Sequence, residues 1–149
     1  MTGAELEALL AEELPITQHL GIQVEHLDAE GLTLRLPLAA NRNHKGAAFA
    51  GSLNAVATLA AWGVLVATLT RSEVDAHVVV QDSSIRYLKP VRGDALAFCP
   101  APKPAELRKA LAVFAKRGRA RIPFEVSITD AGEAAALYQG RYVMHRRGA

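Results

Sequence analysis

The sequence has little cysteine, few aromatic residues and no dominant sign of charge. Its 149 residues include a single cysteine, Cys99, which excludes an intrachain disulfide and any metal site built from several cysteines. Lysine and arginine number 17 against 15 aspartate and glutamate residues, and a net charge of +2 does not indicate a nucleic-acid-binding protein. No platform of aromatic side chains for base stacking accompanies the basic residues, such as those in the segment 116–121. We expect no nucleic-acid partner, and we interpret Cys99 as a small core residue.

Targeting and metal-binding signals are also missing from the sequence. The first fifteen residues, MTGAELEALLAEELP, carry acidic side chains where a secretory signal needs positive charge, so we expect a cytoplasmic protein. His19, His26, His77 and His145 have no partner at metal-ligand or catalytic spacing, and we expect no metal site. No repeat, low-complexity segment or linker interrupts the chain, and its length suits one domain over residues 1–149.

What the sequence does contain is a long stretch without charge, from Ala47 to Thr70. It is long enough to be considered as a membrane span. Polar residues interrupt it, however, and many of its residues are alanine. We therefore favour a buried helix from about Gly51 to Thr70, preceded by a loop over 41–50, and expect no membrane partner.

Apolar periodicity predicts the other elements. Thr2 and Glu5 have the spacing of a capping box at the start of a short amphipathic helix that Pro15 ends. Pro104 is a candidate first residue of a second short helix. Alternation and turn residues predict strands over 21–27, 32–38, 76–88, 95–99, 119–129 and 134–144.

Strict alternation assigns the faces of two of these strands. It places Ile22, Val24 and His26 on one face of the first strand. In the third strand it turns one set toward the long helix and the other away: the first set is Val79, Gln81, Ser83, Ile85 and Tyr87, and the second is Val80, Asp82, Ser84 and Arg86. A helix that is apolar on all sides has to be covered on all sides. We expect an antiparallel sheet to curl around it, with a second subunit over any side left open.

Three motifs identify a family resemblance. The first is N-x-N…G-x-x-F-x-G-S-L, formed by Asn41, Asn43, Gly46, Phe49, Gly51, Ser52 and Leu53. The second is IRYLKPVRGD at 85–94, and the third is GRARIPFEVSI followed by GRYVM. Together they resemble the hotdog-fold thioesterase superfamily, and more narrowly the thioesterase domain also found fused behind GNAT-type acetyltransferases. The resemblance covers residues from about 20 to 144.

The resemblance implies both an architecture and a substrate class. The fold would be α+β, a curved antiparallel sheet wrapped around a long central helix, with a short N-terminal helix. The protein would form a homodimer or a homotetramer with a continuous sheet across subunits. Its substrates would be acyl thioesters of coenzyme A or an acyl carrier protein, bound between subunits beside the N-terminus of the central helix. Coenzyme A would then be part of the substrate, and no cofactor is expected.

Thioester hydrolysis needs a stabilised oxyanion and an activated water. The leading N–H groups of a helix are unpaired and favour negative charge, so Gly51 and Ser52 are candidate oxyanion donors. The alternative is capping, with Ser52 as N-cap and Gly51 as a turn residue. Both interpretations are compatible with the sequence.

A base is harder to identify. Many hotdog thioesterases carry an acid two turns into the helix, whereas LNAVATLAAWG has no carboxylate. Asn54 and Thr58 share a face there and could position water, although Thr58 could instead bond the carbonyl of residue 54. Asn43 is a candidate loop organiser or water ligand. His44 is a candidate base or a solvated histidine, and Asp82 fits a surface carboxylate better than a base.

The remaining candidates are expected to bind substrate. Arg86 and Lys89 could pair with the phosphates of coenzyme A, or lie in a solvated basic turn. The full set of predicted substrate-binding residues is His44, Phe49, Asn54, Gln81, Ser83, Arg86 and Lys89. An acyl-CoA thioesterase is the leading hypothesis. A non-catalytic acyl-thioester-binding domain would explain the missing carboxylate, and a hotdog dehydratase would need a His and acid pair that we do not find.

Overall fold

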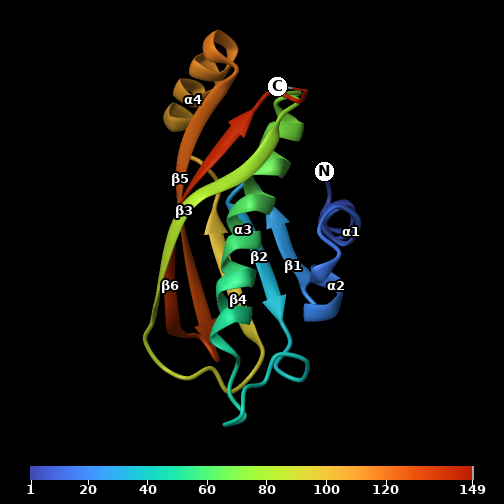
Figure 1. Ribbon diagram of the computed structural model, residues 1–149, viewed down its shortest axis with the longest axis vertical. Coiled ribbons are helices and arrows are strands. Elements are labelled where there is room, and N and C mark those ends of the chain that lie inside the picture. Colours follow the sequence, from blue (N-terminus) through green and yellow to red (C-terminus); the bar gives the residue numbers. More distant parts are fainter. Residues whose placement is uncertain (149) are drawn as a thin grey trace.

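A six-stranded antiparallel sheet curls around one long helix, α3, in the computed structural model, which describes residues 1–148 (Figure 1). The spatial order of the strands is β1-β2-β4-β5-β6-β3. The predicted α+β hotdog fold is therefore confirmed. The elements are α1 (Gly3–Glu13), α2 (Ile16–Leu20), β1 (Gln23–Asp28), β2 (Gly31–Leu36), α3 (Ala50–Arg71), β3 (His77–Tyr87), β4 (Ala95–Pro100), α4 (Pro104–Arg117), β5 (Arg119–Asp130) and β6 (Glu133–His145).

The N-terminal and inserted helices follow their sequence signals. Thr2 caps α1 through a capping box with Glu5, and Pro104 occupies the first turn of α4, both as predicted. The five-residue α2 was not predicted, because Pro15 indicates the end of a helix and α2 is too short to show apolar periodicity. The β1–β2 hairpin is confirmed.

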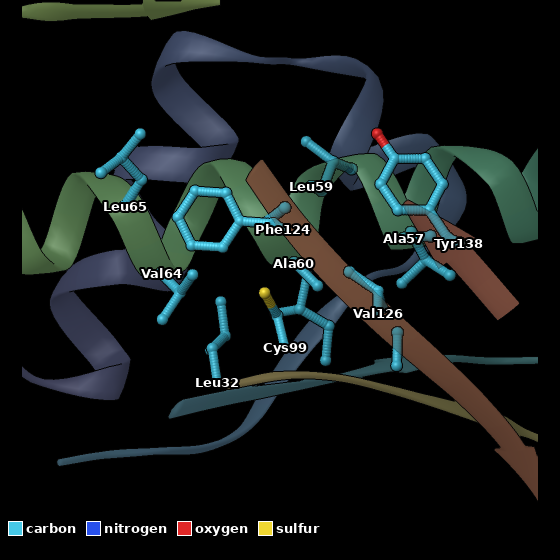
Figure 2. Packing of buried hydrophobic residues seen from close by; sticks show 14 of the residues in the cluster. Leu32, Ala57, Leu59, Ala60, Val64, Leu65, Cys99, Phe124, Val126 and Tyr138 are labelled. Atoms are coloured by element: carbon cyan, nitrogen blue, oxygen red, sulfur yellow. The ribbon is translucent and has the colours of Figure 1, made fainter. Parts of the chain in front are cut away.

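Helix α3 forms the centre of the core, as its lack of charge predicts. Figure 2 shows its apolar side chains packed against residues from four strands. The labelled residues are Ala57, Leu59, Ala60, Val64 and Leu65 of α3 with Leu32, Cys99, Phe124, Val126 and Tyr138 of the sheet. Cys99 is buried, as predicted, and burial raises the pKa of its thiol to about 12. The thiol therefore stays protonated in the core.

By length and composition α3 could also cross a membrane. Within the fold, however, 67% of its most apolar window is buried. The core helix of a folded domain passes the same test, so this single helix is weak evidence for a membrane span.

Gly63 lets α3 approach β2 and α1 closely. A Cβ at this position would lie 2.7 Å from Cδ2 of Leu32 and 3.5 Å from Cδ2 of Leu6, and both leucines are fully buried. We expect Gly63→Val to overpack this contact and lower the free energy of unfolding by about 1–3 kcal/mol. Urea denaturation of Gly63→Val beside a matched Ala55→Val, on the half-buried side of the same helix, measures this. Equal losses at both positions would contradict the close-approach argument.

A β-bulge in each edge strand overturns the facing predicted by strict alternation. In β1 the register shifts between Val24 and His26, so Leu27 packs against the core with Val24 and His26 is exposed. The prediction that Val24 and His26 share a face is therefore wrong. A bulge adds one residue to one strand of a pair, and the residues that follow it change face.

The bulge in β3 falls at Gln81, which has no partner in β6. Val79 pairs with Val143 on the outer face, and Val80 lies opposite the buried Tyr142 on the helix-facing side, so the facing predicted for both valines is wrong. After the bulge the predicted facing holds. Ser83 and Ile85 lie opposite Gly140 and Tyr138, which are buried on the concave side.

Candidate functional site

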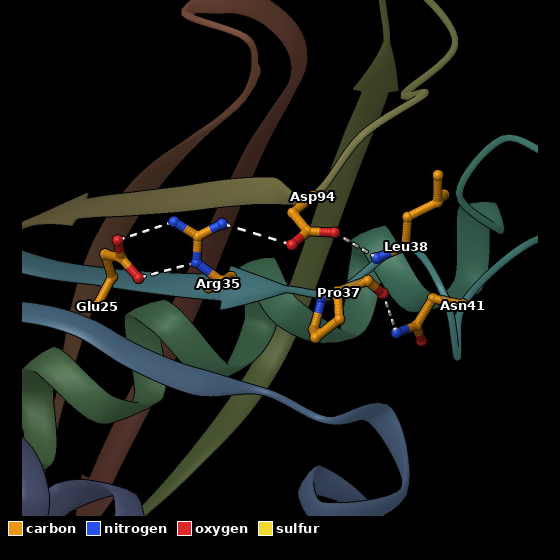
Figure 3. Close-up of polar contacts among 6 residues, drawn as sticks. All are labelled: Glu25, Arg35, Pro37, Leu38, Asn41 and Asp94. Carbon is orange, nitrogen blue, oxygen red and sulfur yellow. Dashed lines mark hydrogen bonds and ion pairs between the residues drawn. The ribbon is translucent and has the colours of Figure 1, made fainter.

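The loop that leads into α3 is fixed by Asn41, which is 3% exposed (Figure 3). Its Nδ2 donates to the carbonyls of Leu20 at 2.8 Å and Pro37 at 2.7 Å, and its own carbonyl accepts from the N–H of Phe49 at 2.7 Å. The side chain of Asn41 therefore ties α2 to the residue that follows β2, and its backbone carbonyl ties the loop to Phe49, the residue before α3.

Asp94 holds the other side of this loop. Its Oδ1 accepts from the N–H of Leu38 at 2.9 Å, and its Oδ2 pairs with Arg35 at 3.5 Å (Figure 3). Arg35 also donates two hydrogen bonds to the Glu25 carboxylate, and these bonds lower the pKa of the Glu25 carboxyl. Asp94, the residue before β4, thus fixes the chain that leaves β2, and Arg35 links this carboxylate to Glu25 of β1.

Asn43 organises the tip of the loop. Its Oδ1 accepts from the N–H groups of Lys45 at 2.8 Å and Ala47 at 3.1 Å, an arrangement typical of an Asx turn. Its backbone N–H also bonds the carbonyl of Ala47 at 2.7 Å. Of the two roles proposed for Asn43, the loop organiser is confirmed.

Helix α3 begins with Phe49 as N-cap and without a side-chain cap. The capping alternative for Ser52 is therefore wrong: Ser52 is buried in the first turn, and its N–H donates to the carbonyl of Phe49 at 3.0 Å. Helix geometry leaves the N–H groups of Ala50 and Gly51 without an intrahelical acceptor. The positive end of the helix dipole is consequently presented by Ala50 and Gly51.

The ring of Phe49 lies over Gly51. A Cβ on Gly51 would fall 2.4 Å from Cε2 of Phe49, a distance that only a shift of the ring could relieve. Phe49 is 56% exposed, which is unusual for so large an apolar side chain. At Gly51 a larger residue would therefore displace an aromatic ring that faces water at the open end of the helix.

A cavity of about 400 Å³ lies beside this helix end. Its walls are mostly apolar, with polar groups from Asn43, Tyr87 and Lys89. The lining residues are Asn43, Ala47, Ala48, Ala50, Leu53, Tyr87, Leu88, Lys89, Pro90 and Val91. Such a mixture of apolar walls and a few polar groups is typical of a small-molecule site.

Tyr87 connects β3 to the start of α3. Its hydroxyl donates to the carbonyl of Ala50 at 3.0 Å, and burial raises the pKa of that hydroxyl, so it remains a donor at neutral pH. Lys89 pairs with Glu133 at 2.5 Å at the rim of the cavity. None of the residues that line the cavity carries a carboxylate, in agreement with the missing base in the sequence.

Asn54 and Thr58 lie on the exposed stripe of α3, one and two turns from Gly51. The Thr58 hydroxyl donates to the carbonyl of Asn54 at 2.8 Å, which confirms the structural alternative for this residue. Its lone pairs can still accept a hydrogen bond. Behind it, Tyr142 donates to the carbonyl of Thr58 at 2.7 Å and is bonded to Tyr138, so the helix is held from the core side at this level.

The remaining predicted residues are not gathered at this cavity. Asp82 is exposed on the outer face, where its pairing with Arg141 lowers the pKa of its carboxyl; it is a surface carboxylate, as predicted. Arg86 lies on the same outer face, opposite Leu137 of β6. His44 is exposed in the loop, and Ser83 is exposed on the side of β3 that faces α3. Within residues 1–148, no three His, Cys, Asp or Glu side chains gather as metal ligands.

A family described as "Putative thioesterase (yiiD_Cterm)" matches residues 3–146. The chain belongs to this family. It is also similar to a solved protein of unknown function from Chlorobaculum tepidum, with 29% identity, 97% and 94% of the two chains covered and a TM-score of 0.94. A structure described as "putative thioesterase" from Shewanella oneidensis has 27% identity, 95% coverage of both chains and a TM-score of 0.82.

A more distant Pseudomonas aeruginosa structure, with the description "Probable Thioesterase", shares the fold at 24% identity, with 97% and 96% coverage and a TM-score of 0.85. Family membership supports thioesterase activity in general and a small-molecule thioester as substrate. The resemblance inferred from the three sequence motifs is confirmed at the level of the family.

Sequence reasoning missed three residues that build the site. The roles of Asn41 and Asp94 depend on contacts 21 and 56 positions away, and Tyr87 reaches a carbonyl 37 positions away. Asn41 and Asp94 both occur in the recognised motifs, NRN and RGD, and that was the one signal available for them.

Proposed function

We propose that the protein hydrolyses acyl-CoA thioesters, with the reacting carbonyl held at the start of α3. The observation that carries this proposal is the pair of N–H groups at Ala50 and Gly51, presented beside a cavity of about 400 Å³. Preorganised donors aimed at a developing oxyanion are usually the largest single contribution to acyl transfer. Water adds to the carbonyl carbon, the C–S bond breaks, and the products are a carboxylic acid and the coenzyme A thiol.

The polar side chains near the start of α3 have different proposed roles, according to their distance from the helix end. Asn43 lines the cavity, and its amide nitrogen is free to donate because its oxygen already serves the turn. Asn54 lies one turn above Gly51 on the exposed stripe. Thr58 is seven residues from Gly51, about 10 Å along the helix axis, and therefore lines the path of the acyl group rather than the reacting carbon.

Without a carboxylate or histidine at the cavity, hydrolysis by this site is expected to be slow. Lys89 at the rim provides positive charge for the phosphates of coenzyme A. The experiment is a panel of acyl-CoA and acyl-carrier-protein thioesters incubated with purified protein and a thiol-detecting dye. Thiol release from the CoA members supports the proposal, and release from carrier-protein thioesters alone contradicts the choice of coenzyme A.

A non-catalytic acyl-thioester-binding protein is the second candidate, favoured by the carboxylate-free cavity. Tight binding of acyl-CoA by calorimetry, together with no thiol release over hours, would establish binding without hydrolysis. Both candidates place the ligand at the same helix end.

We further propose that the protein is a dimer, because the exposed stripe of α3 and the free edge of β3 lie side by side. Val80, which is exposed on the helix-facing side of β3 opposite Tyr142, adds apolar surface that a second copy would cover. Light scattering at micromolar concentration should give twice the mass of one chain, 15.9 kDa, or four times that mass for a tetramer. A monomeric mass would contradict this proposal.

A further inference from the structure

Each N–H group proposed to hold the thioester oxygen shares a peptide group with the carbonyl of the preceding residue. The N–H of Ala50 lies in one plane with the carbonyl of Phe49, and the N–H of Gly51 lies in one plane with the carbonyl of Ala50. The two ends of a peptide group point in opposite directions along a helix, so these N–H groups face the open end of α3 while their carbonyls point into it. A hydrogen bond to the carbonyl therefore acts on the N–H at the other end of the same group.

Both of these carbonyls accept two hydrogen bonds. The carbonyl of Phe49 accepts from two backbone N–H groups of the first turn, at 3.0 and 3.1 Å. The carbonyl of Ala50 accepts the regular helical bond from the N–H of Asn54. Its second bond comes from outside the helix, because the hydroxyl of Tyr87 donates to it from β3 at 3.0 Å. One of the two donor peptide groups is therefore held by a side chain of the sheet.

A hydrogen bond at the oxygen of a peptide group has two effects on its N–H. Hydrogen bonds in a chain polarise one another, by roughly 10–30% per bond, so the N–H becomes a stronger donor. The bond also restrains the peptide plane, so the N–H keeps its direction. Donors that are fixed before the reaction need no reorganisation when negative charge develops on the substrate. The hydroxyl of Tyr87 provides both effects for the N–H of Gly51.

We propose that Tyr87 is a positioning residue for the oxyanion, which it stabilises through the peptide group between Ala50 and Gly51. Its ring lines the cavity at the helix end while its hydroxyl is engaged by the helix. Because burial raises the pKa of this hydroxyl, it keeps its proton at neutral pH and remains a donor. The inference rests on the proposed function, because it takes the thioester oxygen as the acceptor of the Gly51 N–H.

A second tyrosine makes the same kind of bond further along α3 and provides a matched control. The hydroxyl of Tyr142 donates to the carbonyl of Thr58 at 2.7 Å. The N–H at the other end of that peptide group belongs to Leu59, and it is bonded inside the helix. Tyr142→Phe therefore removes an equivalent hydrogen bond that does not lead to a free donor.

Tyr87→Phe removes the hydroxyl and keeps the ring. Because the oxyanion forms only in the transition state, kcat for the best acyl-CoA substrate should fall about three- to tenfold while KM stays unchanged. Tyr142→Phe, checked for folding by circular dichroism, should keep the wild-type kcat. A higher KM at constant kcat would mean that the hydroxyl of Tyr87 contacts the substrate directly, and it overturns the proposal. Equal losses of kcat in the two variants, or no loss in Tyr87→Phe, also overturn it.

A second measurement does not depend on turnover. A ketone analogue of acyl-CoA, in which a methylene replaces the thioester sulfur, keeps the carbonyl and is not hydrolysed. With ¹³C at this carbonyl, its resonance moves downfield as the oxygen accepts stronger hydrogen bonds. The shift on binding should be smaller for Tyr87→Phe than for the wild type and Tyr142→Phe.

This smaller shift supports the inference even if no thioester is hydrolysed, so the failure of the proposed hydrolysis is distinguished from the failure of the inference. Equal shifts in the wild type and Tyr87→Phe, or no shift in either, overturn the inference even in an active enzyme.

Discussion

Gly51→Val is expected to lower kcat/KM for the best acyl-CoA substrate by about 10²–10³, the loss associated with one oxyanion donor. The Cβ of a valine at this position would lie 2.4 Å from Cε2 of Phe49, and the added side chain would take up space at the helix end where the reacting carbonyl is proposed to lie. Because Phe49 is exposed, its ring can move toward water, and the fold should survive the substitution. Steady-state kinetics together with circular dichroism measures both effects.

The double variant Phe49→Ala/Gly51→Val distinguishes two reasons for glycine at this position. If the glycine serves substrate approach, removing the ring leaves the valine in the way and activity stays low. If it only makes room for Phe49, the double variant recovers the activity of Phe49→Ala alone, and the oxyanion assignment is wrong. Asp82→Ala is the matched control: its carboxylate pairs with Arg141 on the outer face and should not affect turnover.

The long central helix could be predicted because its signal is independent of tertiary detail. A charge-free run from Ala47 to Thr70 has to be buried, and the six predicted strands can form a sheet large enough to curl around it. The helix start was located within one residue, at Ala50 instead of Gly51. This shift of one residue changes the free N–H donors from Gly51 and Ser52 to Ala50 and Gly51, because each helix end has only a few unpaired groups.

The bulges in β1 and β3 could not be derived from strict alternation, because a one-residue insertion preserves the period on either side and changes only the phase. In β1 a signal was available: Val24 and Leu27, the two apolar residues that pack on the core, are three positions apart. In β3 three consecutive valines concealed the change of phase before Gln81. Both bulges lie in edge strands, where such irregularities are common and where pairing with a further strand is interrupted.

The site was predicted by residue type, and residue type does not separate donors from acceptors. Asn41 and Asn43 belong to the same motif, yet they use opposite ends of the amide. Asn41 donates to two backbone carbonyls, and its buried Oδ1 has no donor among residues 1–148. Asn43 accepts from two backbone N–H groups. This difference follows from the loop geometry, which the sequence pattern does not specify.

Asn41→Asp is therefore expected to cost about 3–5 kcal/mol of unfolding free energy at pH 7, because it places a buried carboxylate against the carbonyls of Leu20 and Pro37. Asn43→Asp should cost little, because a carboxylate keeps both of its acceptor contacts. The two substitutions make the same chemical change two residues apart in one loop. Urea denaturation of both variants beside the wild type measures the difference.

The free energy of unfolding of Asn41→Asp should also depend on pH in a defined direction. Burial raises the pKa of the new carboxyl at position 41 in the folded state, so the folded protein binds more protons than the unfolded chain between the two pKa values. The stability loss of Asn41→Asp should therefore shrink as the pH is lowered from 7 to about 5, since the protonated acid can donate to one carbonyl. In Asn43→Asp the accepted hydrogen bonds favour the charged carboxylate and lower its pKa in the folded state. The stability of this variant should therefore stay level between pH 7 and 5 and fall only below the unfolded-state pKa of about 4. Equal losses for the two variants at pH 7 would show that Asn41 does not hold the loop by donation, and the positioning of the helix end would then need another cause.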